Sequence, residues 1–252
     1  IPQWRIAHCE LRIKNFARLC YNILEQIKKE VNPMAQFHYI NHACFTITSG
    51  GKTFLFDPFL DGNPEGLKPE DIKCDYIFVS HAHWDHIADA YAIAKANDAT
   101  IITTAEIANQ AGENGCKAHG MHLGGTFMFP FGKVRIAMAF HGSGIAGGHA
   151  CGFVVDLCGT KVYFAGDTAL YGDMALLQRQ DAFDYAIIPI GGNYTMDPKD
   201  AAIAAEFLKA KYVIPIHYNT WPPISQDVNA FKADVEANTS SKVLVIKPGE
   251  TA

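Results

Sequence analysis

The chain has 252 residues, of which 49% are apolar, and a net charge of −5. This length allows one large domain or two small ones, and the charge gives no basic footprint for nucleic acid or a membrane surface. No apolar run approaches the roughly 18 residues of a membrane span, and the scattered, odd-numbered cysteines favour reduced thiols and a cytoplasmic location over a disulfide framework.

Apolar residues recur at helical spacing over residues 9–31, and Asn32-Pro33 ends this predicted helix. We therefore expect an N-terminal helical extension over residues 1–33 and a separate domain over residues 34–252. A sharper hypothesis is that translation starts at Met34, because Lys28-Lys29-Glu30-Val31 can be encoded by a ribosome-binding sequence two codons upstream. The alternative is a genuine helix that docks on the domain or on a second subunit of a homo-oligomer.

The domain begins with short β-rich runs over residues 37–40, 44–48 and 53–56. Asn41-His42 separates the first two runs, and Ser49-Gly50-Gly51-Lys52 between the others predicts a hairpin. Asp57 ends the third run just before a proline. Its carboxylate could hold a neighbouring ligand in a cleft, or it could simply initiate a turn.

A cluster of metal-ligand residues follows the next predicted strand, residues 76–79. In Ser80-His81-Ala82-His83-Trp84-Asp85-His86, three imidazoles and a carboxylate fall within six residues. On a tight loop, His81 and His83 could converge on one ion while Asp85 and His86 turn toward a second. The alternative is a chance histidine cluster on a solvated loop, which so dense a pattern makes improbable.

Predicted helices over residues 87–96 and 105–113 flank a predicted strand over residues 100–103, which argues for a layered α/β arrangement. Thr104 is the expected cap of the second helix. His119 and His122 have ligand-like spacing but no carboxylate or third partner nearby, so we expect neither to be a ligand.

Later predicted strands also end in ligand-type residues. The run over residues 134–140 ends in His141, the hairpin over residues 152–164 ends in Gly166-Asp167, and the strand over residues 212–216 ends in His217. A single histidine is more often structural. His141 gains weight because a catalytic zinc usually has three protein ligands plus water. The Asp167 carboxylate has two oxygens and could bridge two cations.

The remaining predicted elements are a helix over residues 173–180, a buried strand over 185–188, a helix over 201–208, a helix near 226–238 and a strand over 242–246. Asp197-Pro198 supplies a cap and a first-turn proline for the helix that follows. The loop Pro189 to Met196 contains paired glycines, which suggests that it lies against the site or the substrate.

The order Asp57, His81-x-His83-x-Asp85-His86, His141, Asp167, His217 closely resembles the metallo-β-lactamase superfamily over residues 36–248. Within it, Asp57-Pro58-Phe59-Leu60 and Ile216-His217-Tyr218-Asn219 are similar to the poorly characterised prokaryotic metal-dependent hydrolases near the ascorbate-6-phosphate lactonases. The resemblance implies a four-layer αβ/βα sandwich. It also implies one ion on His81, His83 and His141, a second on Asp85, His86 and His217, and Asp167 as the bridge.

Two such ions would generate a bridging hydroxide that attacks an ester, lactone, amide or phosphodiester of a small-molecule substrate. Zinc is the first expectation, and an N/O ligand set also accepts manganese or iron. Asp85 could return a proton to the leaving group, and His42 is expected either to support a ligand or to contact substrate. The alternatives are a di-iron redox enzyme, which would need an electron donor, and a non-catalytic metal-binding or sensing protein.

Overall fold

The computed structural model describes residues 35–180 and 182–252, so the expected extension over residues 1–33 and the proposed start at Met34 lie outside the described residues. Residues Gln36–Ala252 form one compact unit. No helix in the described part of the chain is long and apolar enough to cross a membrane.

The first half of the unit forms a six-stranded sheet with strands in sequence order. Its members are β1 (Gln36–Asn41), β2 (Cys44–Ser49), β3 (Lys52–Phe56), β4 (Tyr76–Phe78), β5 (Thr100–Thr104) and β6 (Lys117–Met121). β1 to β3 are antiparallel, and β3 to β6 are parallel. The predicted hairpin joins β2 to β3, where Ser49 pairs with Lys52 and both intervening glycines have positive φ.

The second half forms a seven-stranded sheet in the order β13-β12-β11-β10-β9-β8-β7. Its strands are β7 (Thr126–Phe129), β8 (Gly132–Met138), β9 (Cys151–Leu157), β10 (Thr160–Phe164), β11 (Tyr185–Pro189), β12 (Tyr212–Ile216) and β13 (Lys242–Val243). β10 to β13 are parallel, while β7, β8, β9 and β10 pair antiparallel in succession. β8 therefore runs in the same direction as β10 and β12.

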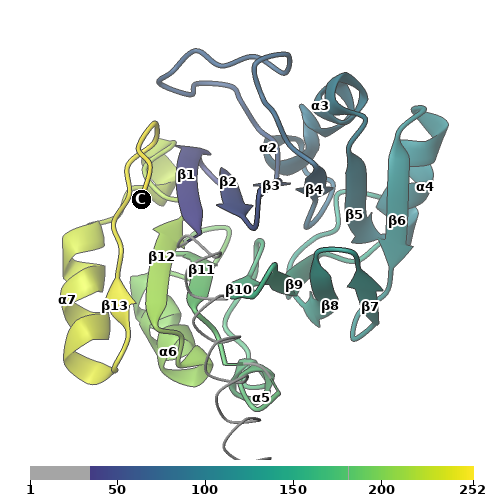
Figure 1. The fold of residues 1–252 in the computed structure, drawn as a ribbon. Coiled ribbons are helices and arrows are strands. Elements are labelled where there is room, and N and C mark those ends of the chain that lie inside the picture. Colours follow the sequence, from purple (N-terminus) through teal and green to yellow (C-terminus); the bar gives the residue numbers. More distant parts are fainter. Residues whose placement is uncertain (1–34, 181) are drawn as a thin grey trace, which may run out of the picture. The chain divides into compact units, whose positions relative to one another are not determined.

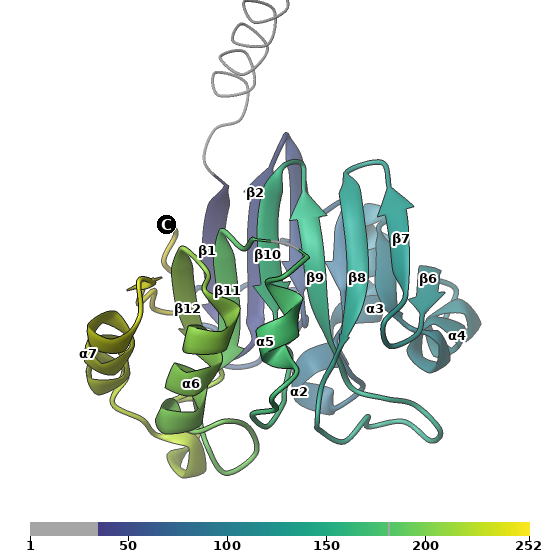
Figure 2. The ribbon, with the colours of Figure 1, turned by 90° about the horizontal axis from the view of Figure 1, so that it is seen from below.

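Helices cover the outer face of each sheet, as Figures 1 and 2 show. α3 (Ala90–Asn97) and α4 (Ala105–Glu113) pack on the first sheet, while α5 (Met174–Leu177), α6 (Pro198–Leu208) and α7 (Val228–Asn238) pack on the second. Between the sheets lies an aromatic layer, in which Phe56 of β3 contacts Phe164 of β10 and Phe78 of β4 contacts Phe153 of β9. The expected four-layer α/β sandwich is therefore confirmed.

Several local predictions need correction. The helix predicted over residues 87–96 is two pieces, α2 (Trp84–Ile87) and α3, so the last part of the histidine motif lies on a helical turn rather than on a loop. β6 was missed because His119 and Gly120 carry no strand pattern. α5 and β13 are shorter than expected, and Thr104 precedes α4 without a capping hydrogen bond. The Asp197 cap of α6 is confirmed, because its carboxylate accepts from Lys199 N and Asp200 N.

Candidate metal centre

The ligand-type residues lie at the carboxyl ends of strands that run in one direction. His42 follows β1, Asp57 follows β3, and the histidine motif follows β4 in the first sheet. His141, Asp167 and His217 follow β8, β10 and β12 in the second sheet. Figure 2 shows α2 and the loop after β8 at the same end of the sheets. Residues that are up to 175 positions apart (His42 to His217) therefore meet at one edge, where ligands commonly bind in α/β proteins.

One cluster contains His81, His83 and His141. His83 Nδ1 lies 2.9 Å from His81 Nε2 and 3.2 Å from His141 Nε2. Nitrogens that bind a tetrahedral zinc at ordinary distances lie about 3.3 Å from one another. The two distances are close to this value, and all three nitrogens lie within 4.8 Å of one another, so the group could hold one ion.

Asp57 orients two of the histidines, His86 by direct contact and His81 through Ser80. Its Oδ2 accepts a hydrogen bond from Ser80 Oγ at 2.6 Å, and the same oxygen lies 2.7 Å from His86 Nδ1. Since the Ser80 hydroxyl proton goes to Asp57, His81 Nδ1 must donate to Ser80 Oγ, 2.9 Å away. His81 then presents an unprotonated Nε2 to the first cluster, and His86 directs its Nε2 toward the second, which is the usual arrangement behind a metal-bound histidine. The geometry therefore supports the expectation that Asp57 holds a neighbouring ligand, rather than the alternative that it only initiates a turn.

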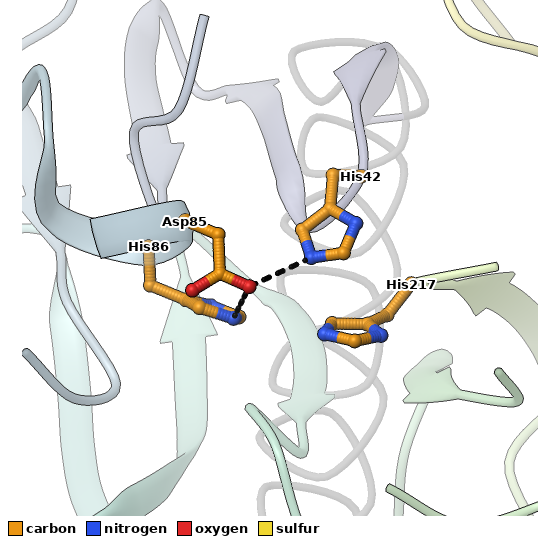
Figure 3. A group of neighbouring side chains, drawn as sticks. All are labelled: His42, Asp85, His86 and His217. Carbon is orange, nitrogen blue, oxygen red and sulfur yellow. Dashed lines mark ion pairs between the residues drawn. The ribbon is translucent and has the colours of Figure 1, made fainter. Parts of the chain in front are cut away.

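A second cluster contains Asp85, His86 and His217, and the structure adds His42 to it (Figure 3). His42 Nε2 and His86 Nε2 lie 3.3 Å and 3.7 Å from Asp85 Oδ2. The Nε2 atoms of His42, His86 and His217 are buried and make no well-formed hydrogen bond. Buried polar atoms in proteins are nearly always satisfied, so this convergence fits a shared cation.

Asp167 lies between the two clusters. Its Oδ2 is 3.1 Å from His217 Nε2 and 3.3 Å from His86 Nε2 in the second cluster, and 3.6 Å from His141 Nε2 in the first. Gly166, with φ +58°, permits this placement because a Cβ there would lie 2.7 Å from Ser80 Cβ. A carboxylate in this position can contact ions in both clusters.

Burial and neighbouring charges set the protonation states. Burial lowers the pKa of His42 to about 4 and also lowers the pKa of His81 and His141. Burial raises the pKa of Asp167, but His86 and His217 outweigh it and hold that pKa well below its usual value. Neutral imidazoles beside an ionised carboxylate are the forms that bind metals.

His86 is the exception among the histidines. Burial by itself lowers the pKa of His86, but Asp167 and Asp57 outweigh burial and raise it well above its usual value. Because Nδ1 donates to Asp57, the additional proton would sit on Nε2, which is the atom that faces the cluster. A proton and a metal ion therefore compete for this nitrogen.

The two clusters open into a cavity of about 540 Å³. His83, Asp85, His141, Asp167 and His217 line its floor. The remaining lining residues are Trp84, Tyr194, Trp221 and Pro223. A volume in this range holds a small molecule.

The structure brings together every residue expected at the site. The sequence pattern missed one feature, which is the position of the His42 ring. His42 was expected to support a ligand or to contact substrate, whereas its ring lies among the potential ligands themselves. The available signal was its position just after a strand, which it shares with the other members. His119 lies elsewhere, against Phe127 and Phe129, as expected for a non-ligand.

Comparisons with known proteins identify the family of this chain. The family model of the beta-lactamase superfamily domain matches residues 52–218. A UPF0173 metal-dependent hydrolase from Natranaerobius thermophilus is 49% identical over 217 residues, which cover 86% of this chain and 98% of the relative. Another, from Symbiobacterium thermophilum, is 46% identical over 220 residues, with the same two shares covered.

Among solved structures, Igni18, a metallo hydrolase from the archaeon Ignicoccus hospitalis, is similar with a TM-score of 0.80 and 33% identity. The match covers 86% of this chain and 97% of Igni18. The chain therefore belongs to the metallo-β-lactamase superfamily, in its UPF0173 group of metal-dependent hydrolases.

Proposed function

We propose that this hydrolase uses two divalent ions to cleave an ester, lactone, amide or phosphodiester of a small molecule. The first ion would lie on His81, His83 and His141. The second would lie on Asp85, His86 and His217, next to His42, with Asp167 shared between the two ions. The observation that carries the proposal is the position of Asp167 Oδ2, within 3.6 Å of a histidine nitrogen in each cluster.

Two such ions would lower the pKa of a water held between them, and so supply hydroxide at neutral pH and polarise the group under attack. The chain's own residues supply the rest. Asp85 lines the cavity and its pKa lies below the usual range, because His42 and His86 outweigh the effect of burial. We assign to Asp85, which is ionised at neutral pH, the uptake of the proton that the attacking water releases and its transfer to the leaving group.

His42 is proposed to act on Asp85. Its Nε2 is 3.3 Å from Asp85 Oδ2, and its Nδ1 is 2.8 Å from Thr220 Oγ1. Thr220 therefore holds the imidazole at Nδ1, and Nε2 faces the Asp85 carboxylate. We infer that His42 positions Asp85 and so supports the second ion through this carboxylate.

Zinc is the proposed metal, because imidazole and carboxylate ligands at these spacings suit it; manganese and iron are compatible with the same donors. A redox reaction would need an electron donor, and the two relatives named above, 46% and 49% identical, carry the names of hydrolases. The free cysteines of the described chain fit a reducing, cytoplasmic environment.

Elemental analysis of the purified protein, followed by assays with a lactone, a thioester and a phosphodiester, tests the proposal. We expect about two metal equivalents per chain and loss of turnover by a factor of at least about 100 in His83→Ala, because catalysis depends on the intact metal pair. His119→Ala is the matched control, because this histidine packs against aromatic rings outside both clusters. Equal turnover by His83→Ala and the unmodified protein would overturn the proposal.

A further inference from the structure

One wall of the metal-centre cavity is aromatic. Trp84 and Trp221 line it, and their ring centroids are 5.6 Å apart. The Trp84 side chain is 60% exposed although it lies between two potential ligands, His83 and Asp85. An indole left open to solvent at the mouth of a cavity is a surface on which an apolar group can pack.

A buried ring supports this wall. Phe59 is only 3% exposed and meets Trp84 edge-on at 5.1 Å and Trp221 at 6.3 Å. Trp221 also lies 4.7 Å from the His42 ring. The indoles are therefore held by packing on the metal centre itself, and a group that rests on them lies directly beside the reacting bond.

The described lining of the cavity contains no cationic lysine or arginine side chain. These are the side chains that normally bind phosphate and carboxylate groups. Its charged side chains are Asp85 and Asp167, both acidic. Any positive charge in the cavity would come from the metal ions, and the substrate group under attack would already be bound to those ions.

We propose that the substrate carries an uncharged apolar group, aromatic or branched aliphatic, that packs on Trp84 and Trp221 beside the bond to be cleaved. This inference rests on the hydrolase function proposed above and narrows its substrate to apolar esters, lactones or amides. We expect sugar phosphates and other substrates with an anionic group away from the reacting bond to bind weakly, because no lysine or arginine lines the described cavity.

Binding measured separately from turnover tests this inference. The zinc-loaded full-length protein would be titrated calorimetrically with acetate, phenylacetate and 4-carboxyphenylacetate, which share one carboxylate and differ in what the indoles would meet. We expect phenylacetate to bind about tenfold more tightly than acetate, a factor typical of added aromatic packing. The added charge of 4-carboxyphenylacetate should remove most of that gain.

The variants Trp84→Gln and Trp221→Gln should each reduce the preference for phenylacetate, with zinc content measured on each variant. Trp84→Phe should keep most of the preference, and Phe127→Ala, which removes an exposed ring on β7, should leave it unchanged. Equal binding of acetate and phenylacetate by the unmodified protein would overturn the inference, even if esters are hydrolysed. A phenylacetate preference without any hydrolysis would support the apolar subsite and overturn the proposed reaction.

Discussion

His42 and His217 are joined both through the backbone and through their rings. The His217 N–H donates to the His42 carbonyl at 2.8 Å, and the ring centroids are 3.9 Å apart. Both residues have positive φ, 53° and 55°, which costs a non-glycine residue roughly 1–3 kcal/mol. The contact ties the end of β1 in one sheet to the end of β12 in the other, and so fixes the second ligand cluster.

Replacing His42 should weaken the second metal site. His42→Asn keeps a residue that tolerates positive φ but removes the imidazole beside Asp85, His86 and His217. We expect zinc affinity at one of the two sites to fall by about 10–100-fold, the range found when support for a metal site is lost. Competition with a chromophoric chelator measures the affinity of each site.

Thr220→Val is the control for this substitution, because it removes only the hydroxyl 2.8 Å from His42 Nδ1. Its effect on zinc affinity should be smaller than that of His42→Asn. Unchanged affinity at both sites in His42→Asn would show that the ring takes no part in the centre.

Asp57→Asn should reduce metal affinity without removing any proposed ligand. The asparagine side chain has one acceptor oxygen, so it cannot accept from Ser80 N, Ser80 Oγ and His86 Nδ1 as the carboxylate does. His86 would then lose its fixed tautomer, and we expect a loss of about 10–100-fold. Zinc titration checks this.

Asp75→Asn serves as the matched comparison for Asp57→Asn. Asp75 also accepts a backbone hydrogen bond, from Thr53 N, but it is exposed and lies at the other end of β4. Its replacement should leave zinc affinity unchanged. An equal loss in both variants would point to a general effect on the first sheet.

Two glycines of one loop should respond differently to alanine. Gly144 has φ +70°, and a Cβ there would lie 2.4 Å from the Ala82 carbonyl carbon and 2.6 Å from His83 N. Gly147 has φ +74° and nothing within 4 Å. Both substitutions carry a left-handed penalty of about 1–2 kcal/mol, but only Gly144→Ala displaces the backbone of a proposed ligand.

We therefore expect Gly144→Ala to lower turnover and zinc binding by at least about tenfold, and Gly147→Ala to change neither by more than about twofold. Turnover, zinc titration and thermal unfolding of the pair provide the measurement. Similar turnover in the two variants would contradict the close contact between this loop and the metal-binding turn.

Metal removal should lower thermal stability. Ions that bind only the folded chain stabilise it by about 2.7 kcal/mol at a concentration of 100 times the dissociation constant, which corresponds to a shift of about 5–10 °C in a domain of this size. Differential scanning calorimetry before and after chelation, and after zinc is restored, measures the shift.

The stabilisation by zinc should shrink as the pH falls, because protons compete with metal for His86 Nε2 and the other imidazoles. His83→Ala should gain less from zinc than the unmodified protein does. If the midpoint temperature of thermal unfolding does not change when zinc is added, metal binding does not stabilise the folded chain as proposed.

The candidate site could be read from the sequence to a large extent because its members either follow a strand directly or belong to the histidine motif after β4. Apolar runs predict strands, and His141, Asp167 and His217 each lie just beyond one. Local chemistry also predicted the β2–β3 hairpin and the Asp197 cap, since both depend on a few adjacent residues. Propensity could not place α2, because four residues give too weak a helical pattern.

Spacing along the chain therefore determined which side chains could be ligands and that two ions were plausible. Only the tertiary structure decided that His42 joins the second cluster and that Phe59 supports two indoles above the clusters. The physical reason is that these relations depend on the packing of two sheets through a shared aromatic layer. Their register is set by contacts between distant residues, which no local pattern records.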